Sequence, residues 1–283
     1  MRPVSSESDL SMTERFFLKA FCVPPPPVPV EPRDTLDTTR PPPLSDDPLG
    51  RVRRVFGATF EAAIRNRVFL DIGCGPGEQV IGAALSGASL AIGVDKNDIS
   101  IRLGQSLAEQ RGVASNVRLT TDPVTSFGLD WADVALSQNS FEHFDDPALI
   151  LRQAYEALRP GGKFFVTFGP SWWHPYGVHH MFMIRMPWAH LFFSEKTILR
   201  VRQLYRPNQP TSWRDVSLNQ MTIRRLLELA KGSGFELTTL SVTPIGPLPQ
   251  WLVRTRPFRE WTTSDVSVIL TKPTADRHGA RPL

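Results

Sequence analysis

The feature that most constrains the fold is the stretch from Val68 to Gly77, where a short apolar strand runs directly into a glycine-rich turn. Residues 79–85 then have the composition of a helix. Glycines at positions 73, 75 and 77 let the backbone turn sharply and approach a ligand, because no Cβ atom stands in the way. The helix N-terminus presents its free N–H groups to the same point. The stretch therefore predicts a nucleotide-type binding site.

Asp71 narrows the class of ligand. It lies at the end of the strand, two residues before the first glycine, and the spacing G-x-G-x-G differs from the dinucleotide pattern G-x-G-x-x-G. A carboxylate here repels a pyrophosphate and attracts a cationic group. S-adenosyl-L-methionine (SAM) carries a sulfonium and an ammonium group and has no phosphate. We therefore expect SAM as the cofactor; the alternative is a loop with accidental glycines.

The run from Leu70 to Gly77 closely resembles motif I of class I SAM-dependent methyltransferases. This resemblance implies that the strand end and the turn bind the cofactor. The residues implied are Asp71, Gly73, Cys74, Gly75 and Gly77.

A second acidic residue, Asp95, follows the next predicted strand, Leu90–Val94. It lies eighteen residues beyond Gly77, close to the ~20 expected for a carboxylate that binds ribose hydroxyls. Two vicinal hydroxyls offer two donors that one carboxylate accepts together. We expect Asp95, with Lys96 beside it, in the cofactor site; a surface-turn aspartate is the alternative.

A third acidic residue, Asp122, lies just past the predicted strand Val117–Thr120. The methyltransferase resemblance implies that it binds the adenine amino group. A local Asx-turn before Pro123 is the alternative interpretation.

The fourth and fifth predicted strands, Ala132–Leu136 and Lys163–Phe168, flank a helix and the turn Arg159-Pro160-Gly161-Gly162. This order, with Glu142-His143 after the fourth strand, strongly resembles the ubiquinone/menaquinone-type branch of small-molecule methyltransferases. The resemblance covers about residues 49–168 and is specific for the cofactor rather than the acceptor. Gln138 and Asn139, at the end of the fourth strand, complete the expected cofactor site.

Strands alternating with helices predict an α/β fold, a doubly wound and mostly parallel sheet with right-handed crossovers. Ligands of such sheets bind at the carboxyl ends of the strands, so the acidic residues above should converge on one cleft. The family resemblance implies seven strands in a Rossmann-like sheet. Its last two strands, Phe235–Val242 and Val266–Thr271, would form a hairpin in which the final strand is antiparallel.

We divide the chain into a Pro-rich N-terminal extension over residues 1–47, a methyltransferase domain over residues 48–273 and a tail over residues 274–283. The extension is expected to be flexible, although Met12–Phe21 could form one or two amphipathic helical turns. Residues 169–221 are predicted as a substrate lid, because aromatic and histidine side chains gather there directly after the fifth strand. They include Trp172, Trp173, Tyr176, Phe182, Trp188, Phe192 and Phe193, and His174, His179, His180 and His190.

Methyl transfer is an in-line displacement that needs alignment of donor and acceptor and, for a hydroxyl acceptor, a base. His143, at the expected cleft, is the first candidate, and a packing role at the helix entry is its alternative. His179 and His180 are further candidates, of which at most one should face the cleft. No carboxylate or cysteine cluster accompanies His174, His179 and His180, so no metal site is expected. The lid tryptophans could stack on an acceptor or form a small core.

Composition excludes several classes. The formal net charge is +4, and the short run Arg51–Arg54 is interpreted as the solvated face of a helix, so no nucleic-acid partner is expected. No Asp/Asn-Pro-Pro-Tyr/Phe motif follows the fourth strand, which argues against an enzyme that methylates the exocyclic amino groups of DNA bases. Methylation of a pyrimidine at C5 needs a nucleophilic cysteine, and neither Cys22 nor Cys74 is placed for that role. The two cysteines also imply neither a disulfide nor a zinc site. No apolar run reaches the ~18–20 residues of a membrane span, and we expect a cytoplasmic protein.

The sequence therefore predicts a SAM-dependent methyltransferase that acts on a small-molecule or sugar-type acceptor by O-methylation. Two alternatives remain open. One is a SAM-binding scaffold without transferase activity, and the other is a methyltransferase acting on a lipid or quinone-type acceptor.

Overall fold

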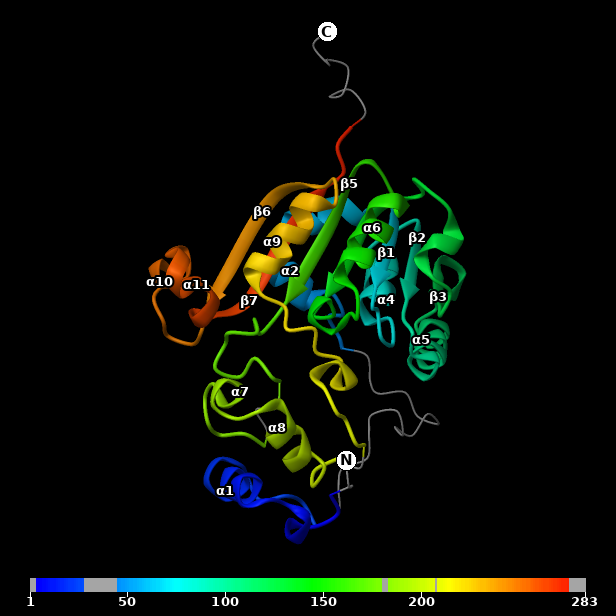
Figure 1. Cartoon of the computed structure of the whole chain (residues 1–283). Coiled ribbons are helices and arrows are strands. Elements are labelled where there is room, and N and C mark those ends of the chain that lie inside the picture. Colours follow the sequence, from blue (N-terminus) through cyan, green and yellow to red (C-terminus); the bar gives the residue numbers. More distant parts are fainter. Residues whose placement is uncertain (1–3, 28–44, 180–182, 207, 275–283) are drawn as a thin grey trace.

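A computed structural model describes residues 4–27, 45–179, 183–206 and 208–274. A seven-stranded sheet forms the centre, and helices cover both of its faces (Figure 1). The strands are β1 (Val68–Ile72), β2 (Leu90–Val94), β3 (Val117–Thr120), β4 (Ala132–Gln138), β5 (Leu158–Phe168), β6 (Glu236–Pro244) and β7 (Thr263–Thr271). The helices around the sheet are α2 (Gly50–Phe56), α3 (Ala58–Ile64), α4 (Glu78–Leu85), α5 (Asp98–Gln110), α6 (Pro147–Ala157) and α9 (Ile223–Gly232).

The strand order β3-β2-β1-β4-β5-β7-β6 confirms the predicted fold class. The pairs β1–β2, β2–β3, β1–β4 and β4–β5 are parallel, and β7 runs antiparallel to both β5 and β6. In β1, Leu70 pairs with Ile92 of β2 and with Ala135 of β4. The order reverses between β1 and β4, and an open α/β sheet binds its ligands beyond the strand ends at such a point.

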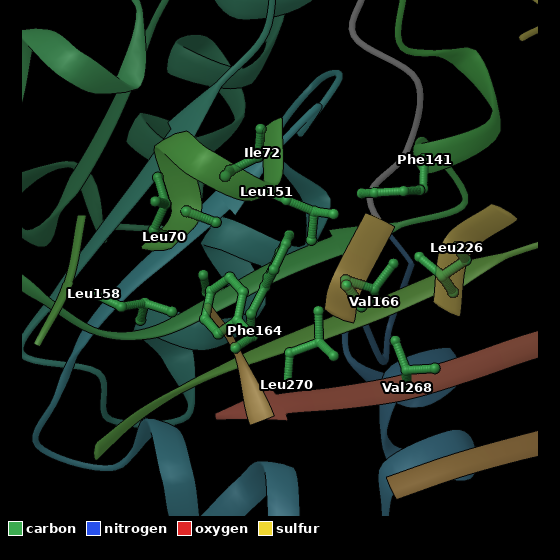
Figure 2. Packing of buried hydrophobic residues seen from close by; sticks show 14 of the residues in the cluster. Leu70, Ile72, Phe141, Leu151, Leu158, Phe164, Val166, Leu226, Val268 and Leu270 are labelled. Carbon is green, nitrogen blue, oxygen red and sulfur yellow. The ribbon is translucent and has the colours of Figure 1, made fainter. Parts of the chain in front are cut away.

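Each face of the sheet has its own apolar core, because successive side chains of a strand point to opposite faces. Phe69 packs with Phe60 and Phe165 beneath α2–α5, whereas Leu70 belongs to the cluster beneath α6 and α9. Figure 2 shows this second cluster, which contains Leu70, Leu158 and Phe164 of the sheet and Leu151 of α6. Burial on both faces explains why β1 and β4 are nearly continuous apolar runs.

Some elements differ from the predicted ones. Residues 50–64 form two helices rather than one continuous helix, because Gly57 has φ +57° and ends α2 after about two turns. Strand β5 begins at Leu158, so the Pro-Gly-Gly run lies inside the strand rather than before it. The insertion between β6 and β7 contains two short helices, α10 (Gln250–Arg254) and α11 (Arg256–Thr262).

The N-terminal segment is packed, which corrects the expectation of a flexible extension for residues 4–27. Helix α1 (Met12–Phe21) contacts α8 (Glu195–Arg202), and Phe17 of α1 is fully buried. Cys22 forms an antiparallel bridge with Ile184, and the main-chain N–H of Val23 donates to the carbonyl of Met183. The amphipathic spacing of α1 supplies the physical reason: its apolar side needs a partner, and segment 169–221 provides one. Residues 28–44 and 275–283 lie outside the described ranges.

Segment 169–221 contains α7 (Ala189–Phe192), α8 and the 3₁₀ helix η6 (Trp213–Val216). Together with residues 4–23 it forms a third apolar cluster, separate from the two cores of the sheet. In Figure 1 this cluster lies beyond the ends of the strands, around α1, α7 and α8. In the part of the chain that the structure describes, no helix is both long and apolar enough to cross a membrane.

Candidate active site

The glycine-rich turn crosses from the end of β1 toward β2. Gly73, Gly75 and Gly77 have φ values of +79°, +52° and +74°, a region that favours glycine. The main-chain N–H groups of Gly73 and Cys74 both donate to the carbonyl of Val94, at 2.8 and 3.2 Å. A Cβ atom on Gly73 would lie 2.8 Å from the Cβ of Ser140, so this position has no room for a side chain. The turn is thereby held across the sheet edge.

Asp95 fastens the same turn from β2. Its Oδ2 accepts a hydrogen bond from the N–H of Gly75, and its Oδ1 accepts one from the N–H of Asn97, both at 2.8 Å. The carboxylate oxygens keep further lone pairs, so these bonds leave acceptors for a ligand. The structure thus brings Asp95 and the glycine turn together; the ribose contact itself stays a prediction.

Asp71 lies inside the sheet rather than on the wall of a pocket. It is 1% exposed and its Oδ1 has no hydrogen-bond partner among the described residues. Burial, followed by the nearby negative charge of Asp95, raises the pKa of Asp71 from 3.8 to about 8. Asp71 is therefore mainly protonated near pH 7, and it could respond to a cation at the strand ends only through the protein interior, not by direct exposure to a ligand.

A pocket of about 380 Å³ opens beside the turn, at the carboxyl ends of β1 and β2. Asp95 and Lys96 line it from β2, and Ser140, His143 and Phe144 line it from the segment after β4. Its wall is mainly apolar, with Val94, Val124, Leu149 and Ile150 among the lining residues. A glycine turn, a carboxylate and apolar side walls fit a nucleoside-bearing cation, so the residues present fit SAM. We call this the cofactor pocket.

Lys96 and Asp122 occupy the rim rather than the depth of this region. The Lys96 ammonium lies 3.8 Å from the carboxylate of Asp145 across the cofactor pocket, and both side chains are exposed. Asp122 is exposed, its carboxylate lies 3.8 Å from Arg118, and its N–H donates to the Thr120 hydroxyl. Its neighbours Pro123 and Val124 line the pocket, whereas Asp122 itself does not. The adenine contact stays a prediction.

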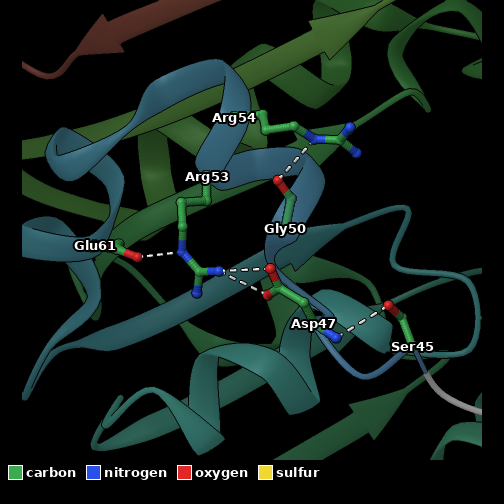
Figure 3. Close-up of polar contacts among 6 residues, drawn as sticks. All are labelled: Ser45, Asp47, Gly50, Arg53, Arg54 and Glu61. Carbon is green, nitrogen blue, oxygen red and sulfur yellow. Dashed lines mark hydrogen bonds and ion pairs between the residues drawn. The ribbon is translucent and has the colours of Figure 1, made fainter.

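Gln138 and Asn139 line a different hollow, of about 690 Å³, between β4, α4 and α2. The Gln138 Oε1 is buried without a hydrogen-bond partner among the described residues, and the N–H of Asn139 donates to the Thr167 carbonyl. Figure 3 shows the α2 side of this hollow, where the Arg53 guanidinium donates to both oxygens of Asp47 and to Glu61. Arg53 and its two acidic partners are about half exposed, so these ion pairs lie on the solvated helix face that the sequence predicted.

His143 stands between two pockets. It ends the short 3₁₀ helix η5 (Phe141–His143), which follows β4. Its Nδ1 lies 2.6 Å from the carbonyl oxygen of Ser217, and its ring lies 5.2 Å from that of His179. A carbonyl only accepts, so the neutral ring carries its proton on Nδ1 and has its lone pair on Nε2.

The second pocket, of about 340 Å³, lies between the sheet edge and segment 169–221. His143, Phe144, Asp145 and Ser217 line both this pocket and the cofactor pocket. Arg214, Asn219 and Arg225 are among its other lining residues, together with Glu195 and Trp213. We call it the junction pocket, because it meets the cofactor pocket at His143.

The other candidate histidines differ in what the structure describes. His179 has φ +56°, and burial, with His143 beside it, lowers its pKa to about 4. It is therefore neutral near pH 7 and packs edge-on against His143. His180 lies outside the described residues, so its predicted role stays a prediction.

The tryptophans of segment 169–221 pack mainly on each other. The Trp173 ring lies 5.0 Å from that of Trp261 in α11, and Trp172 packs against His190 and Trp213. The indole N–H of Trp188 donates to the Trp173 carbonyl at 3.0 Å. These contacts favour a small local core over stacking on an acceptor, except for Trp213, which lines the junction pocket.

The sequence did not indicate Ser140 or Ser217. The Ser140 hydroxyl donates to the carbonyl of Gly73 at 3.0 Å and so joins the end of β4 to the glycine turn. Its position directly after β4 was the available signal. Ser217, whose φ is +55°, lies 74 residues from His143 in the sequence, and no local pattern predicts the contact between the two residues.

Comparisons with known proteins agree with this geometry. Residues 65–170 match the family model of a methyltransferase domain. A ubiquinone biosynthesis O-methyltransferase of Parvibaculum lavamentivorans is 33% identical over 99 residues, which cover 35% of this chain and 39% of that protein. The chain thus spans less than half the length of the curated relatives it matches.

Solved structures share the fold at low sequence identity. A SAM-dependent methyltransferase of Mesorhizobium loti aligns with a TM-score of 0.52 at 16% identity, covering 81% of this chain and all of that one. The 4+2 cyclase SpnF aligns with a TM-score of 0.54 at 16% identity, covering 80% and 82% of the two chains. Residues 65–170 accordingly match a methyltransferase domain, the chain has the fold of SAM-dependent methyltransferases, and the expected resemblance to their ubiquinone-type branch is confirmed.

Proposed function

We propose that this protein transfers the methyl group of SAM to a hydroxyl group of a small-molecule acceptor bound in the junction pocket. The observation that carries the proposal is the place of His143. This side chain lines both the cofactor pocket and the junction pocket, so one imidazole reaches the methyl donor and the acceptor. The relatives named as O-methyltransferases support transfer to oxygen.

The cofactor pocket would hold SAM through the glycine turn and Asp95. When bound, SAM supplies an electrophilic methyl group on a sulfonium leaving group. The chain's own contribution is position and electrostatics, because alignment of the reacting groups lowers the barrier to displacement. Burial raises the pKa of Asp71 to about 8, and a sulfonium bound in this pocket would favour the ionised form of that carboxyl group.

His143 would remove the acceptor's proton. Its Nδ1–H donates to the Ser217 carbonyl, which fixes the tautomer and leaves Nε2 as the base. The neutral His179 packs against the ring and holds its orientation without adding a competing charge. A proton taken by Nε2 would leave a cationic ring that the Ser217 carbonyl stabilises.

The decisive experiment combines calorimetry with turnover. Wild-type protein should bind S-adenosylhomocysteine, and His143→Ala should keep that affinity while kcat falls by about 10²–10⁴-fold. His190→Ala is the matched control, because this half-buried histidine packs on Trp172 and lines neither pocket. Wild-type protein that does not bind S-adenosylhomocysteine would overturn the proposed function, and full activity in His143→Ala would overturn the base.

A quinone-type or other lipid acceptor is the second candidate, which the names of the ubiquinone-biosynthesis relatives support. Incubation with labelled SAM and a panel of phenols, catechols, quinols and sugar hydroxyls separates the acceptor classes. The 4+2 cyclase among the structures of this fold is a reason to measure label transfer itself. SAM binding with no labelled product from the panel or from a cell extract would favour the scaffold alternative.

A further inference from the structure

The α10–α11 insertion carries large apolar side chains on its outer surface. Trp251 is 61% exposed and Phe258 is 50% exposed, and Trp261 and Leu248 are also exposed. Arg254 and Arg256, which lie between these rings in the sequence, are exposed as well. The insertion thus presents aromatic and cationic side chains together, a composition typical of segments that bind at the surface of a bilayer.

The one acidic residue of this insertion points inward. Glu260 accepts hydrogen bonds from the N–H groups of Ile223 and Arg224 at the start of α9, and from the hydroxyl of Ser171. Both carboxylate oxygens are therefore used to fasten α11 to the body. The outer surface keeps its positive charge, because the balancing carboxylate is turned away from it.

Helix α1 repeats this arrangement independently. Its exposed residues include Met12, Arg15, Phe16 and Lys19, which have the i, i+3, i+4, i+7 spacing of one helical face. Phe16 is 59% exposed. The only acid of α1, Glu14, is buried and pairs with Arg200 of α8 at 2.9 Å. A second element thus exposes aromatic and cationic side chains and buries its carboxylate.

Ring contacts link the two elements across the molecule. Trp261 of α11 lies 6.3 Å from Trp188, which precedes α7, and Phe193 at the end of α7 lies 4.6 Å from Phe17 of α1. Between them α7 exposes Phe192. In Figure 1, the pair α10–α11, then α7, then α1 follow one another along the left side of the molecule.

We propose that α10–α11, α7 and α1 form one surface that docks reversibly on an anionic lipid bilayer. Arginine and lysine would contact the lipid phosphates while Trp251, Phe258 and Phe16 enter the interface. A protein partner would need a complementary shape over these rings, whereas a bilayer adapts to side chains spread over three short elements. This inference is independent of the methyl-transfer proposal.

The test is flotation of the full chain with vesicles, without SAM or acceptor. We compare vesicles of phosphatidylcholine alone with vesicles that also contain phosphatidylglycerol, and repeat the second case at rising salt. Binding is expected only to the anionic vesicles and should weaken with salt, because the charges are exposed. A blue shift of tryptophan fluorescence, lost in Trp251→Phe, would locate the contact in α10.

Two double variants test the surface. Trp251→Ser/Phe258→Ser removes the rings and Arg254→Glu/Arg256→Glu reverses the charge, and each should weaken vesicle binding by about tenfold or more. Leu129→Ser is the matched control, since Leu129 is an exposed apolar residue in the loop before β4. Thermal unfolding identifies any variant that fails to fold, and the other double variant then decides.

Three outcomes would overturn the proposal. One is no binding of wild-type protein to anionic vesicles, and another is equal binding of wild type and both double variants. The third is a dimer of wild-type protein that Trp251→Ser/Phe258→Ser converts to monomer without any vesicle binding, because a second copy would then be the occupant.

Discussion

Asp71 is a carboxyl group held almost entirely away from water, at 1% exposure, beside a second carboxylate. Its pKa rises from 3.8 to about 8 in the folded state, so the native protein keeps a proton that the unfolded chain releases. The free energy of unfolding therefore falls as pH rises from about 4 to about 8.

We predict that Asp71→Asn flattens this dependence and raises stability at about pH 8, by up to a few kcal/mol. Urea unfolding of both proteins across this pH range measures it. Asp98→Asn is the control, because Asp98 is exposed and forms an ion pair with Arg102 on the surface of α5. An identical pH slope in wild type and Asp71→Asn would contradict the prediction.

Asp95 acts on the cofactor pocket in two ways, by holding the Gly75 N–H and by offering free lone pairs to a ligand. We expect Asp95→Ala to weaken S-adenosylhomocysteine binding by about 10–100-fold, since a charged acceptor and the tether of the turn are lost together. Calorimetry provides the measurement, and Asp95→Asn should retain part of the affinity.

Asp122→Ala separates the two interpretations of that residue in the same assay. An adenine contact requires weaker binding, whereas an exposed carboxylate that only pairs with Arg118 requires unchanged binding. Unchanged affinity in Asp95→Ala would contradict the ribose assignment.

At the scale of elements, the sequence predicted the central strands well, because burial on both faces of the sheet makes β1 and β2 nearly continuous apolar runs. The positions of the glycine turn and of Asp95 could also be predicted from the sequence, because they depend on local backbone geometry and on where a strand ends. Ser217 and the inward position of Asp71 could not be found, because they depend on contacts between distant segments. The position of α1 was not predicted, because the sequence of an amphipathic helix does not show which segment its apolar face packs against.

The buried pair of Glu14 and Arg200 joins α1 to α8, with side-chain exposures of only 6% and 10%. We predict that Glu14→Gln loosens this junction by about 3 kcal/mol, because Arg200 would keep a buried charge without its carboxylate. Hydrogen exchange should increase in α1 and α8 and stay unchanged in β1 and β4. Arg15→Gln, an exposed change on the same helix, is the control; equal protection of α1 in both variants would contradict the prediction.

At the scale of the whole molecule, the two apolar clusters on the sheet and the third apolar cluster support different pockets. The clusters on the sheet support the cofactor pocket, and the cluster of residues 4–23 with segment 169–221 supports the far wall of the junction pocket. A change confined to the third cluster should therefore alter acceptor binding more than cofactor binding. Phe17 suits this test, because it is fully buried and lies 4.6 Å from Phe193.

We predict that Phe17→Ala raises KM for the acceptor several-fold and leaves the affinity for S-adenosylhomocysteine unchanged. The cavity should cost about 3–5 kcal/mol locally, and it lies in the cluster that carries Trp213 at the junction pocket. Phe16→Ala removes an exposed ring from the same helix and should leave both constants as in wild type. Equal loss of cofactor and acceptor binding in Phe17→Ala would mean that the third cluster and the clusters on the sheet unfold together. The third cluster would then not support acceptor binding separately from cofactor binding.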